Sequence, residues 1–217
     1  MTGGRPIVFL GPSLPVSEAR QELPDAVFLP PVKRGSLYGL LPDLPSAIGI
    51  VDGEFYQSFA ISTQEILVFL ERGVPVFGSS SMGALRAVEL DPHGMIGVGT
   101  VYRMFRSGAL DADDEVAMTF CPDTLRPLSE PMVNFRVALA AARRAGLLTA
   151  GQSRQLCRCL KAAYFPERTM SRFFAELARV IPQERLPALR EWWREAAPNA
   201  KADDARRLLW SMRHHKL

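Results

Sequence analysis

The chain has 217 residues, of which 47% are hydrophobic and 23% are charged, and its formal net charge is +3. This composition is typical of a globular protein that is long enough for one full domain and a smaller appendage. No apolar run approaches the roughly 20 residues that cross a bilayer, and the N-terminus lacks the pattern of a signal peptide. The sequence therefore predicts a soluble, cytoplasmic protein with no membrane segment.

The charges are divided unevenly along the chain. Residues 1–136 contain 10 Lys or Arg and 16 Asp or Glu, whereas residues 137–217 contain 16 and 7. A division this large suggests two regions with different tasks, so we expect a core domain over 1–136 and a basic region over 137–217. The basic region can face an acidic peptide, an acidic protein or nucleic acid, or it can consist of solvated helix faces.

The first half of the chain alternates between strand and helix patterns. Short apolar runs that end at Gly, Pro or Asp lie at residues 7–10, 27–29, 47–51 and 74–77. Their length and their lack of alternation are typical of strands buried on both faces. Helical patterns lie at residues 17–21, 62–72 and 82–90. This order predicts an α/β fold with a doubly wound, mostly parallel sheet of the Rossmann or flavodoxin type.

The second half has helical patterns and no strand pattern. A long helix is expected to begin at Ser129-Glu130-Pro131 and to end near Ala145, before Gly146. Further helical stretches run over residues 149–163, 169–180, 183–196 and 200–213. We therefore expect a helical C-terminal region packed on the α/β core.

Small and polar residues follow three of the predicted strands. These segments are Gly11-Pro12-Ser13, Asp52-Gly53-Glu54 and Gly78-Ser79-Ser80-Ser81. In an open parallel sheet, ligands bind outside the carboxyl ends of the strands. The spacing therefore predicts that Ser13, Asp52 and Ser81 converge on one edge of the sheet.

The segment from Ser79 to Gly83 has the form small-x-Ser-x-Gly between a strand and a helix, which is the layout of a nucleophile elbow. In such an elbow Ser81 projects from a tight turn, and the amide of Met82 at the helix N-terminus can stabilise an oxyanion. Two alternatives stay open. The hydroxyls of Ser79, Ser80 and Ser81 and the helix amides can hold a phosphate or carboxylate, or the serines only cap the helix.

A serine nucleophile needs a base, and the sequence offers several candidates. His93 lies in a turn after the third predicted helix, and the other two histidines lie at the C-terminus. Lys33 is another candidate base or anion contact. The acidic cluster at residues 111–115 can bind a cation, orient a base, dock a basic partner, or simply favour a helix N-terminus.

Five motifs identify a family when they are taken together and in order. They are Ile50-Val51-Asp52-Gly53-x-Phe55, Gly78-x-Ser80-Ser81-Met82-Gly83-Ala84-Leu85-Arg86-Ala87-x-Glu89-Leu90, Gly94-Met95-x-Gly97-Val98-Gly99, Asp113-Asp114-Glu115-Val116-Ala117 and Leu128-Ser129-Glu130-Pro131-Met132-Val133-Asn134-x-Arg136. Over roughly residues 7–136 the chain resembles the TfuA family.

The resemblance implies a pathway. TfuA-like proteins are partners of YcaO enzymes, which use ATP to activate a peptide-bond oxygen and install a backbone thioamide in ribosomal peptides or in an enzyme subunit. The family member is thought to recruit and stimulate YcaO, and to release sulfide by hydrolysing the C-terminal thiocarboxylate of a ubiquitin-fold sulfur carrier such as ThiS. The alternatives are a non-catalytic adaptor of YcaO acting on a ribosomal precursor peptide, and a small-molecule-binding α/β protein. We expect no metal, no cofactor and no nucleic-acid partner.

Thiocarboxylate hydrolysis assigns roles to residues at the predicted sheet edge. Ser81, Asp52 and Arg86 are the expected catalytic residues: nucleophile, orienting carboxylate and anion clamp. The residues expected to contact the substrate are Ser13, Lys33, Glu54, Ser79, Ser80, Met82 and Gly83. The chain has Thr63-Gln64 and Met118-Thr119-Phe120 at positions where the family pattern carries histidines, which leaves the general base unassigned.

Overall fold

The computed structural model describes residues 4–55 and 59–215. The chain forms two compact units, Met1–Asp111 with Lys201–Leu217, and Ala112–Ala200. These bounds follow contacts, whereas the predicted division at residue 136 follows charge and motifs. None of the described helices is long and apolar enough to span a membrane.

The first unit is built on a sheet whose described strands are all parallel. They are β1 (Ile7–Phe9), β2 (Val27–Leu29), β3 (Ile48–Ile50), β4 (Val76–Ser79) and β5 (Ile96–Val98), in the order β2-β1-β3-β4-β5. The central strands β3 and β4 are buried throughout, and the edge strands β2 and β5 are half-buried. The predicted α/β class with a parallel sheet is confirmed, and the order is that of flavodoxin-like folds.

Strand β5 was not predicted, because Gly97 interrupts a short apolar run. A Cβ atom at Gly97 would lie 2.1 Å from the ring of Tyr102 on the following helix, α4 (Gly99–Arg106). Glycine therefore allows the tyrosine to pack directly on the strand. The same glycine weakens the apolar pattern by which a strand is recognised in the sequence.

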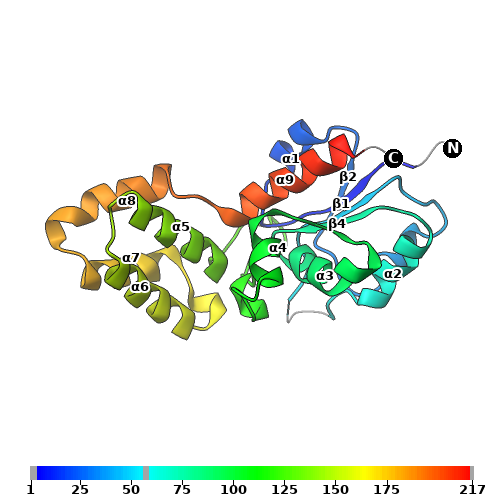
Figure 1. The fold of residues 1–217 in the computed structure, drawn as a ribbon. Coiled ribbons are helices and arrows are strands. Elements are labelled where there is room, and N and C mark those ends of the chain that lie inside the picture. Colours follow the sequence, from blue (N-terminus) through cyan, green and yellow to red (C-terminus); the bar gives the residue numbers. More distant parts are fainter. Residues whose placement is uncertain (1–3, 56–58, 216–217) are drawn as a thin grey trace. The chain divides into compact units, whose positions relative to one another are not determined.

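Helices cover both faces of this sheet (Figure 1). Helices α2 (Thr63–Glu71), α3 (Met82–Leu90) and α4 lie on one face, and α1 (Val16–Glu22) and α9 (Ala200–His214) lie on the other. The capping box that the sequence indicates at Ser62 and Glu65 is present at the start of α2. The remaining short 3₁₀ turns of this unit are η1 (Tyr38–Leu40) and η2 (Asp91–His93).

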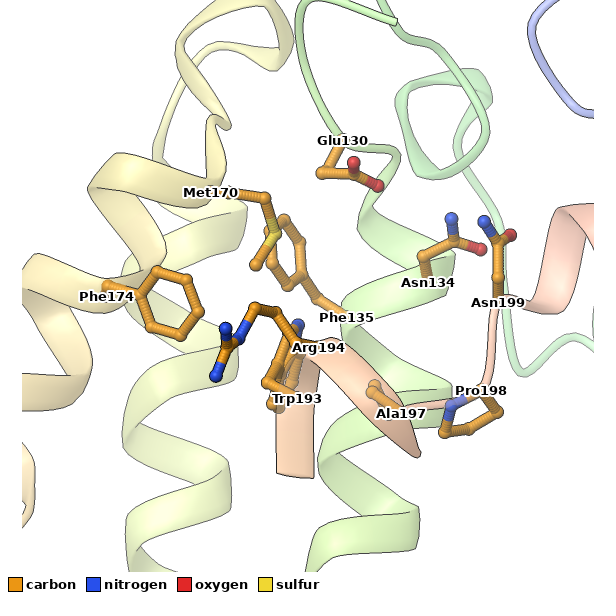
Figure 2. Close-up of a pocket in the computed structure, with 11 residues that line it drawn as sticks. Glu130, Asn134, Phe135, Met170, Phe174, Trp193, Arg194, Ala197, Pro198 and Asn199 are labelled. Carbon is orange, nitrogen blue, oxygen red and sulfur yellow. The ribbon is translucent and has the colours of Figure 1, made fainter. Parts of the chain in front are cut away.

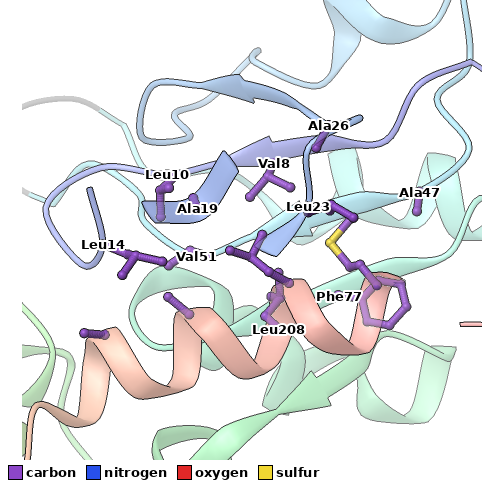
Figure 3. Close-up of a cluster of buried hydrophobic side chains, with 14 residues drawn as sticks. Val8, Leu10, Leu14, Ala19, Leu23, Ala26, Ala47, Val51, Phe77 and Leu208 are labelled. Carbon is purple, nitrogen blue, oxygen red and sulfur yellow. The ribbon is translucent and has the colours of Figure 1, made fainter. Parts of the chain in front are cut away.

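Helix α9 completes the core of the α/β unit, although it is the last helix of the chain. Figure 3 shows it beneath the strands, where Ala205, Leu208 and Met212 join the cluster that contains Val8 and Phe77. A Cβ atom at Gly49 of β3 would lie 2.6 Å from the sulfur of Met212. The helix therefore seats closely on the centre of the sheet.

Helix α3 also approaches the sheet closely, through two glycines. A Cβ atom at Gly83 would lie 1.7 Å from the carbonyl oxygen of Ile50, and one at Gly78 would lie 2.2 Å from the carbonyl oxygen of Gly83. The amide of Gly83 donates a hydrogen bond to the carbonyl oxygen of Val51 at 3.3 Å. This contact fixes the N-terminus of α3 against the end of β3.

The second unit is helical in its described residues. Its elements are η3 (Asp113–Glu115), α5 (Met132–Arg144), α6 (Ala150–Ala162), η4 (Phe165–Glu167), α7 (Met170–Val180), η5 (Gln183–Arg185) and α8 (Leu186–Glu195). The rings of Phe135, Phe173 and Trp193 form its centre, with 4.1 Å between the centroids of Phe173 and Trp193. The predicted helical C-terminal region is confirmed.

Two residues of the acidic cluster, Asp114 and Glu115, belong to an ion-pair network inside the second unit. Glu115 pairs with Arg136 and Lys161, both at 2.7 Å, and Asp114 pairs with Lys161 and Arg168. Burial raises the pKa of both carboxyl groups, but the hydrogen bonds from these cations outweigh it and hold each pKa below its ordinary value. The network holds η3 against α5 and α6, which gives the two acidic residues a structural role.

Candidate active site

The candidate site lies at the carboxyl ends of β1, β3 and β4. In the order β2-β1-β3-β4-β5, the order of the strands across the sheet reverses between the parallel neighbours β1 and β3, and ligands of open α/β sheets bind at this switch point. Ser13 follows β1, Asp52 follows β3, and Ser80 and Ser81 follow β4. The predicted convergence of Ser13, Asp52 and Ser81 is present in the structure.

Asp52 is the centre of the site. One of its carboxylate oxygens, Oδ2, accepts hydrogen bonds from the amides of Gly11 at 2.9 Å and Ser13 at 3.0 Å. The other, Oδ1, accepts one from the hydroxyl of Ser13 at 2.6 Å. The carboxylate is 1% exposed, and these three donors replace the water that burial removes.

Ser80 occupies the sharp turn between β4 and α3. Its φ angle is +65°, a left-handed conformation that is uncommon for residues other than glycine. Its hydroxyl donates to the hydroxyl of Ser13 at 3.0 Å, so a chain of hydrogen bonds runs from Ser80 through Ser13 to Asp52. The sequence predicted that Ser81 would occupy the sharp turn. In the structure Ser80 has the positive φ angle of this turn, and Ser81 is the next residue, at the N-cap of α3.

Ser81 contacts a cation from the other end of the chain. The ammonium group of Lys201, on α9, donates a hydrogen bond to the hydroxyl of Ser81 at 3.0 Å and lies 3.7 Å from Oδ1 of Asp52. Ser81 and Lys201 are each 2% exposed. The site thus combines a serine hydroxyl, an amine and a carboxylate within hydrogen-bonding or ion-pair distance.

Two further features make this site suited to an oxyanion. Ser79 is fully buried, and its hydroxyl has no hydrogen-bond partner among the described residues. Such an atom loses its hydration without a compensating hydrogen bond from the described residues. Met82 begins α3, where the helix dipole favours negative charge.

Other predicted site residues lie outside this cluster. Arg86 forms an ion pair with Glu89 on its own helix, and its Nε atom is buried without a partner among the described residues. Lys33 is exposed, and the side chain of Glu54 is half-buried without a described contact to the cluster. Gly83 serves the packing of α3. The roles of these residues toward a substrate stay predictions.

A separate pocket lies within the second unit (Figure 2). Its volume is about 340 Å³, and its walls combine aromatic side chains, Phe135, Phe174 and Trp193, with polar ones. Glu130 and Asn134, from the fifth sequence motif, are two of the polar residues that line it. The pocket is at the lower end of the size range of small-molecule sites and has their mixed lining.

Comparison with known protein families identifies the family to which the chain belongs. The model of the TfuA-like protein family matches residues 52–169, just over half of the sequence. The chain belongs to the TfuA-like family. No curated protein resembles the chain closely enough to count as a match. The family match includes Asp52, the serines at the end of β4, and Glu130 and Asn134 of the pocket. TfuA-like proteins are generally associated with YcaO partners.

The sequence reasoning missed Lys201. It lies outside the residues matched to the family, 120 positions from Ser81, in a helix expected to belong to a basic C-terminal region. One signal was available: Ala205, one helical turn after the lysine, is small, so this face of the helix can approach a neighbouring element closely. Nothing in the spacing indicates which strand end it meets.

Proposed function

We propose that this protein hydrolyses the thiocarboxylated C-terminus of a ubiquitin-fold, ThiS-like sulfur carrier and thereby supplies sulfide to a YcaO enzyme that forms peptide thioamides. The observation that carries the proposal is the buried cluster of Ser81, Lys201 and Asp52 at the switch point of the sheet. Membership of the TfuA-like family supports the pathway.

The chemistry required is acyl transfer to water. The carbonyl carbon of the thiocarboxylate must be attacked by a nucleophile, and the negative charge on the resulting tetrahedral oxygen must be stabilised. The Ser81 hydroxyl is the proposed nucleophile. The amide of Met82 and the unpaired hydroxyl of Ser79 are the proposed donors to the oxyanion.

Access of the carrier tail to Ser81 is restricted, because the cluster is buried. Ser13, Asp52, Ser80, Ser81 and Lys201 are each exposed by 5% or less. A carrier tail can reach Ser81 only if the chain that covers the cluster moves. We therefore expect slow hydrolysis by the protein alone and faster hydrolysis when a YcaO partner is bound, because binding energy can drive such a movement.

The test is sulfide release from a purified thiocarboxylated carrier, with and without the YcaO partner. Ser81→Ala should lower the rate by at least about 100-fold while the protein keeps its far-UV circular dichroism and thermal midpoint. Ser107→Ala is a matched control, because Ser107 lies at the exposed end of α4. A wild-type rate in Ser81→Ala excludes Ser81 as the nucleophile.

The pocket of the second unit favours a second candidate function, that of a non-catalytic adaptor. Its aromatic wall and its polar rim match the requirements of a site that receives one apolar side chain of the YcaO partner. An adaptor of this kind activates YcaO without producing sulfide.

Added sulfide separates the two functions. If the protein is only an adaptor, thioamide formation with free sulfide still requires it, and Phe174→Ala in the pocket wall should weaken the stimulation by about tenfold. Trp210→Ala is the control, because this tryptophan is 59% exposed and does not line the pocket. If free sulfide makes the protein dispensable, the adaptor function is wrong.

A further inference from the structure

The pocket of the second unit has lining groups that a purely apolar side chain would not use. Besides the aromatic wall, the lining includes the carboxylate of Glu130, the amides of Asn134 and Asn199, and the guanidinium group of Arg194. We infer that the pocket receives a tyrosine or tryptophan side chain, and that an acidic residue lies beside it in the partner's chain. The identity of that partner as YcaO rests on the adaptor function proposed above, but the choice of side chain can be measured without YcaO.

The apolar side of the pocket favours a ring as the occupant. Phe135, Phe174 and Trp193 line it together with the thioether of Met170. Aromatic rings gain energy from contact with other rings and with thioether sulfur, beyond the effect of the buried area. Trp193 in turn packs on the buried ring of Phe173, with 4.1 Å between the centroids. The wall is therefore fixed before the occupant arrives, which lowers the entropy lost on binding.

The polar side of the pocket favours a ring that carries a hydrogen-bond donor. In Figure 2, Glu130, Asn134 and Asn199 lie to the right of Phe174. A carboxylate has room for about four hydrogen bonds, so Glu130 can accept one from a ligand in addition to its contacts within the chain. A phenylalanine or aliphatic side chain would take water from this half-buried carboxylate and give no hydrogen bond in return. The phenol of tyrosine and the indole of tryptophan supply both the ring and the donor.

Two arginines of α8 give the rim of the pocket a positive charge. Arg194 lines the pocket, and Arg190, one turn earlier, lies over the ring of Phe174 with 5.3 Å between its guanidinium carbon and the ring centroid. Both arginines are exposed, and neither has an ion pair among the described residues. Glu191 and Glu195 are turned about 100° around the helix axis from them, so the two cations share a face of their own. A carboxylate next to the inserted ring complements this face and steers the partner's approach.

Three small probes test the choice of side chain on the full chain. They are N-acetyl-tyrosinamide, N-acetyl-tryptophanamide and N-acetyl-phenylalaninamide, and the tyrosine and phenylalanine probes differ by a single hydroxyl group. Binding is measured by NMR titration of the ¹⁵N-labelled protein through the indole signal of Trp193, which is assigned by its loss in Trp193→Phe. We expect the tyrosine and tryptophan probes to bind at least about tenfold more tightly than the phenylalanine probe, because only they donate to Glu130.

Variants of Glu130 test whether its carboxylate causes this preference. Glu130→Leu removes the acceptor, so the tyrosine and phenylalanine probes should bind it equally well. Glu130→Gln keeps a neutral acceptor, whose hydrogen bond is about half as strong, so the preference should fall to about threefold. Glu191→Gln is the control, because this residue is exposed on α8 and does not line the pocket. If Glu130→Leu loses its far-UV circular dichroism, the reduced preference of Glu130→Gln decides the question.

Binding of purified YcaO tests the acidic neighbour and the partner. Arg194→Glu should weaken YcaO binding by about tenfold, because the rim then repels the partner's carboxylate. Arg143→Glu carries the same change of charge at the exposed end of α5, outside the pocket, and should bind YcaO like wild type. The tryptophan probe at saturation should also displace YcaO, and the phenylalanine probe at the same concentration should displace much less of it.

The results separate the occupant of the pocket from the adaptor function. If the tyrosine and phenylalanine probes bind equally well to wild type, or if no probe shifts the Trp193 signal, the inferred side chain is wrong even where YcaO needs the pocket. If the probes show the expected preference but neither Phe174→Ala nor the tryptophan probe weakens YcaO binding, the adaptor function is wrong and the selectivity of the pocket stands. If Arg194→Glu binds YcaO as tightly as Arg143→Glu, no acidic residue lies beside the inserted ring.

Discussion

Replacement of Gly83 by alanine tests whether the close approach of α3 to the sheet positions the site. The added Cβ atom would lie 1.7 Å from the carbonyl oxygen of Ile50, and Cβ atoms essentially never come closer than 3.0 Å to such an atom. The helix must therefore retreat by about 1.3 Å, the difference between these distances. The obstructing atom belongs to the backbone of a buried strand, so it cannot rotate away.

The expected free-energy change is the balance of two effects. Overpacking of this kind destabilises a protein by about 1–3 kcal/mol, and more where the backbone cannot yield. Alanine is favoured over glycine in a helix by about 1 kcal/mol, which offsets part of that cost. We expect Gly83→Ala to lower the free energy of unfolding by about 2 kcal/mol, the upper end of the overpacking cost less the gain in helix propensity. It should also lower sulfide release by about 100-fold, because the retreat of α3 displaces Ser81 from the rest of the cluster.

Urea unfolding followed by far-UV circular dichroism measures the stability. Two other glycines are matched controls: Gly151 is in helix α6, and Gly39 is in the same unit as Gly83. A Cβ atom at Gly151 meets its nearest neighbour at 3.9 Å, and one at Gly39 meets nothing within 4 Å. Alanine at either should leave stability unchanged or raise it by up to about 1 kcal/mol. If Gly83→Ala is as stable as these controls, the described contact with Ile50 is wrong.

Two further predictions concern the turn and the ion-pair network. Ser80→Gly should be more stable than Ser80→Ala by about 0.5–1 kcal/mol in thermal unfolding, because both variants lose the hydroxyl but only glycine adopts the positive φ without strain; equal stabilities would contradict the turn geometry. The pKa of Glu115 lies below its unfolded value, since hydrogen bonds from Arg136 and Lys161 outweigh the effect of burial. Its contribution to stability is therefore present above the unfolded pKa and is lost as the pH falls through the folded pKa. The thermal midpoint of Glu115→Gln should lie well below that of wild type at about pH 6, and the gap should close toward about pH 3; a gap that does not depend on pH would contradict the ion pairs.

The sheet and the edge that carries the site were predictable because both follow from local signals. The apolar runs before Gly11, Asp52 and Gly78 identify three strands, and the carboxyl ends of parallel strands meet at one edge whatever the rest of the chain does. Ser13, Asp52 and Ser81 could therefore be placed together without a structure. The elbow could be predicted only to within one residue, because the three consecutive serines do not indicate which of them takes the positive φ.

The position of α9 was not predictable in the same way. Its sequence is amphipathic like that of the other C-terminal helices, so the pattern predicts a helix but does not indicate which surface it covers. The contact between Lys201 and Ser81 joins residues 120 positions apart, and the structure alone brings them together. Lys201 is consequently the part of the cluster that the motifs could not contain.

Energetic costs in the cluster support an active site over a structural network. Ser80 holds a left-handed conformation that costs about 1–2 kcal/mol in an L-residue. The buried hydroxyl of Ser79 has no partner among the described residues, which costs about 1–3 kcal/mol. The pair of Lys201 and Asp52 must be desolvated, and apolar residues of similar volume are often at least as stable as such a pair. If these positions had only a structural role, glycine, alanine and apolar side chains would fill it at a lower cost in folding free energy. Three unfavourable features at one strand-to-helix junction support the proposed reaction at Ser81, since strained backbone and unpaired polar atoms concentrate where a ligand supplies the missing interactions.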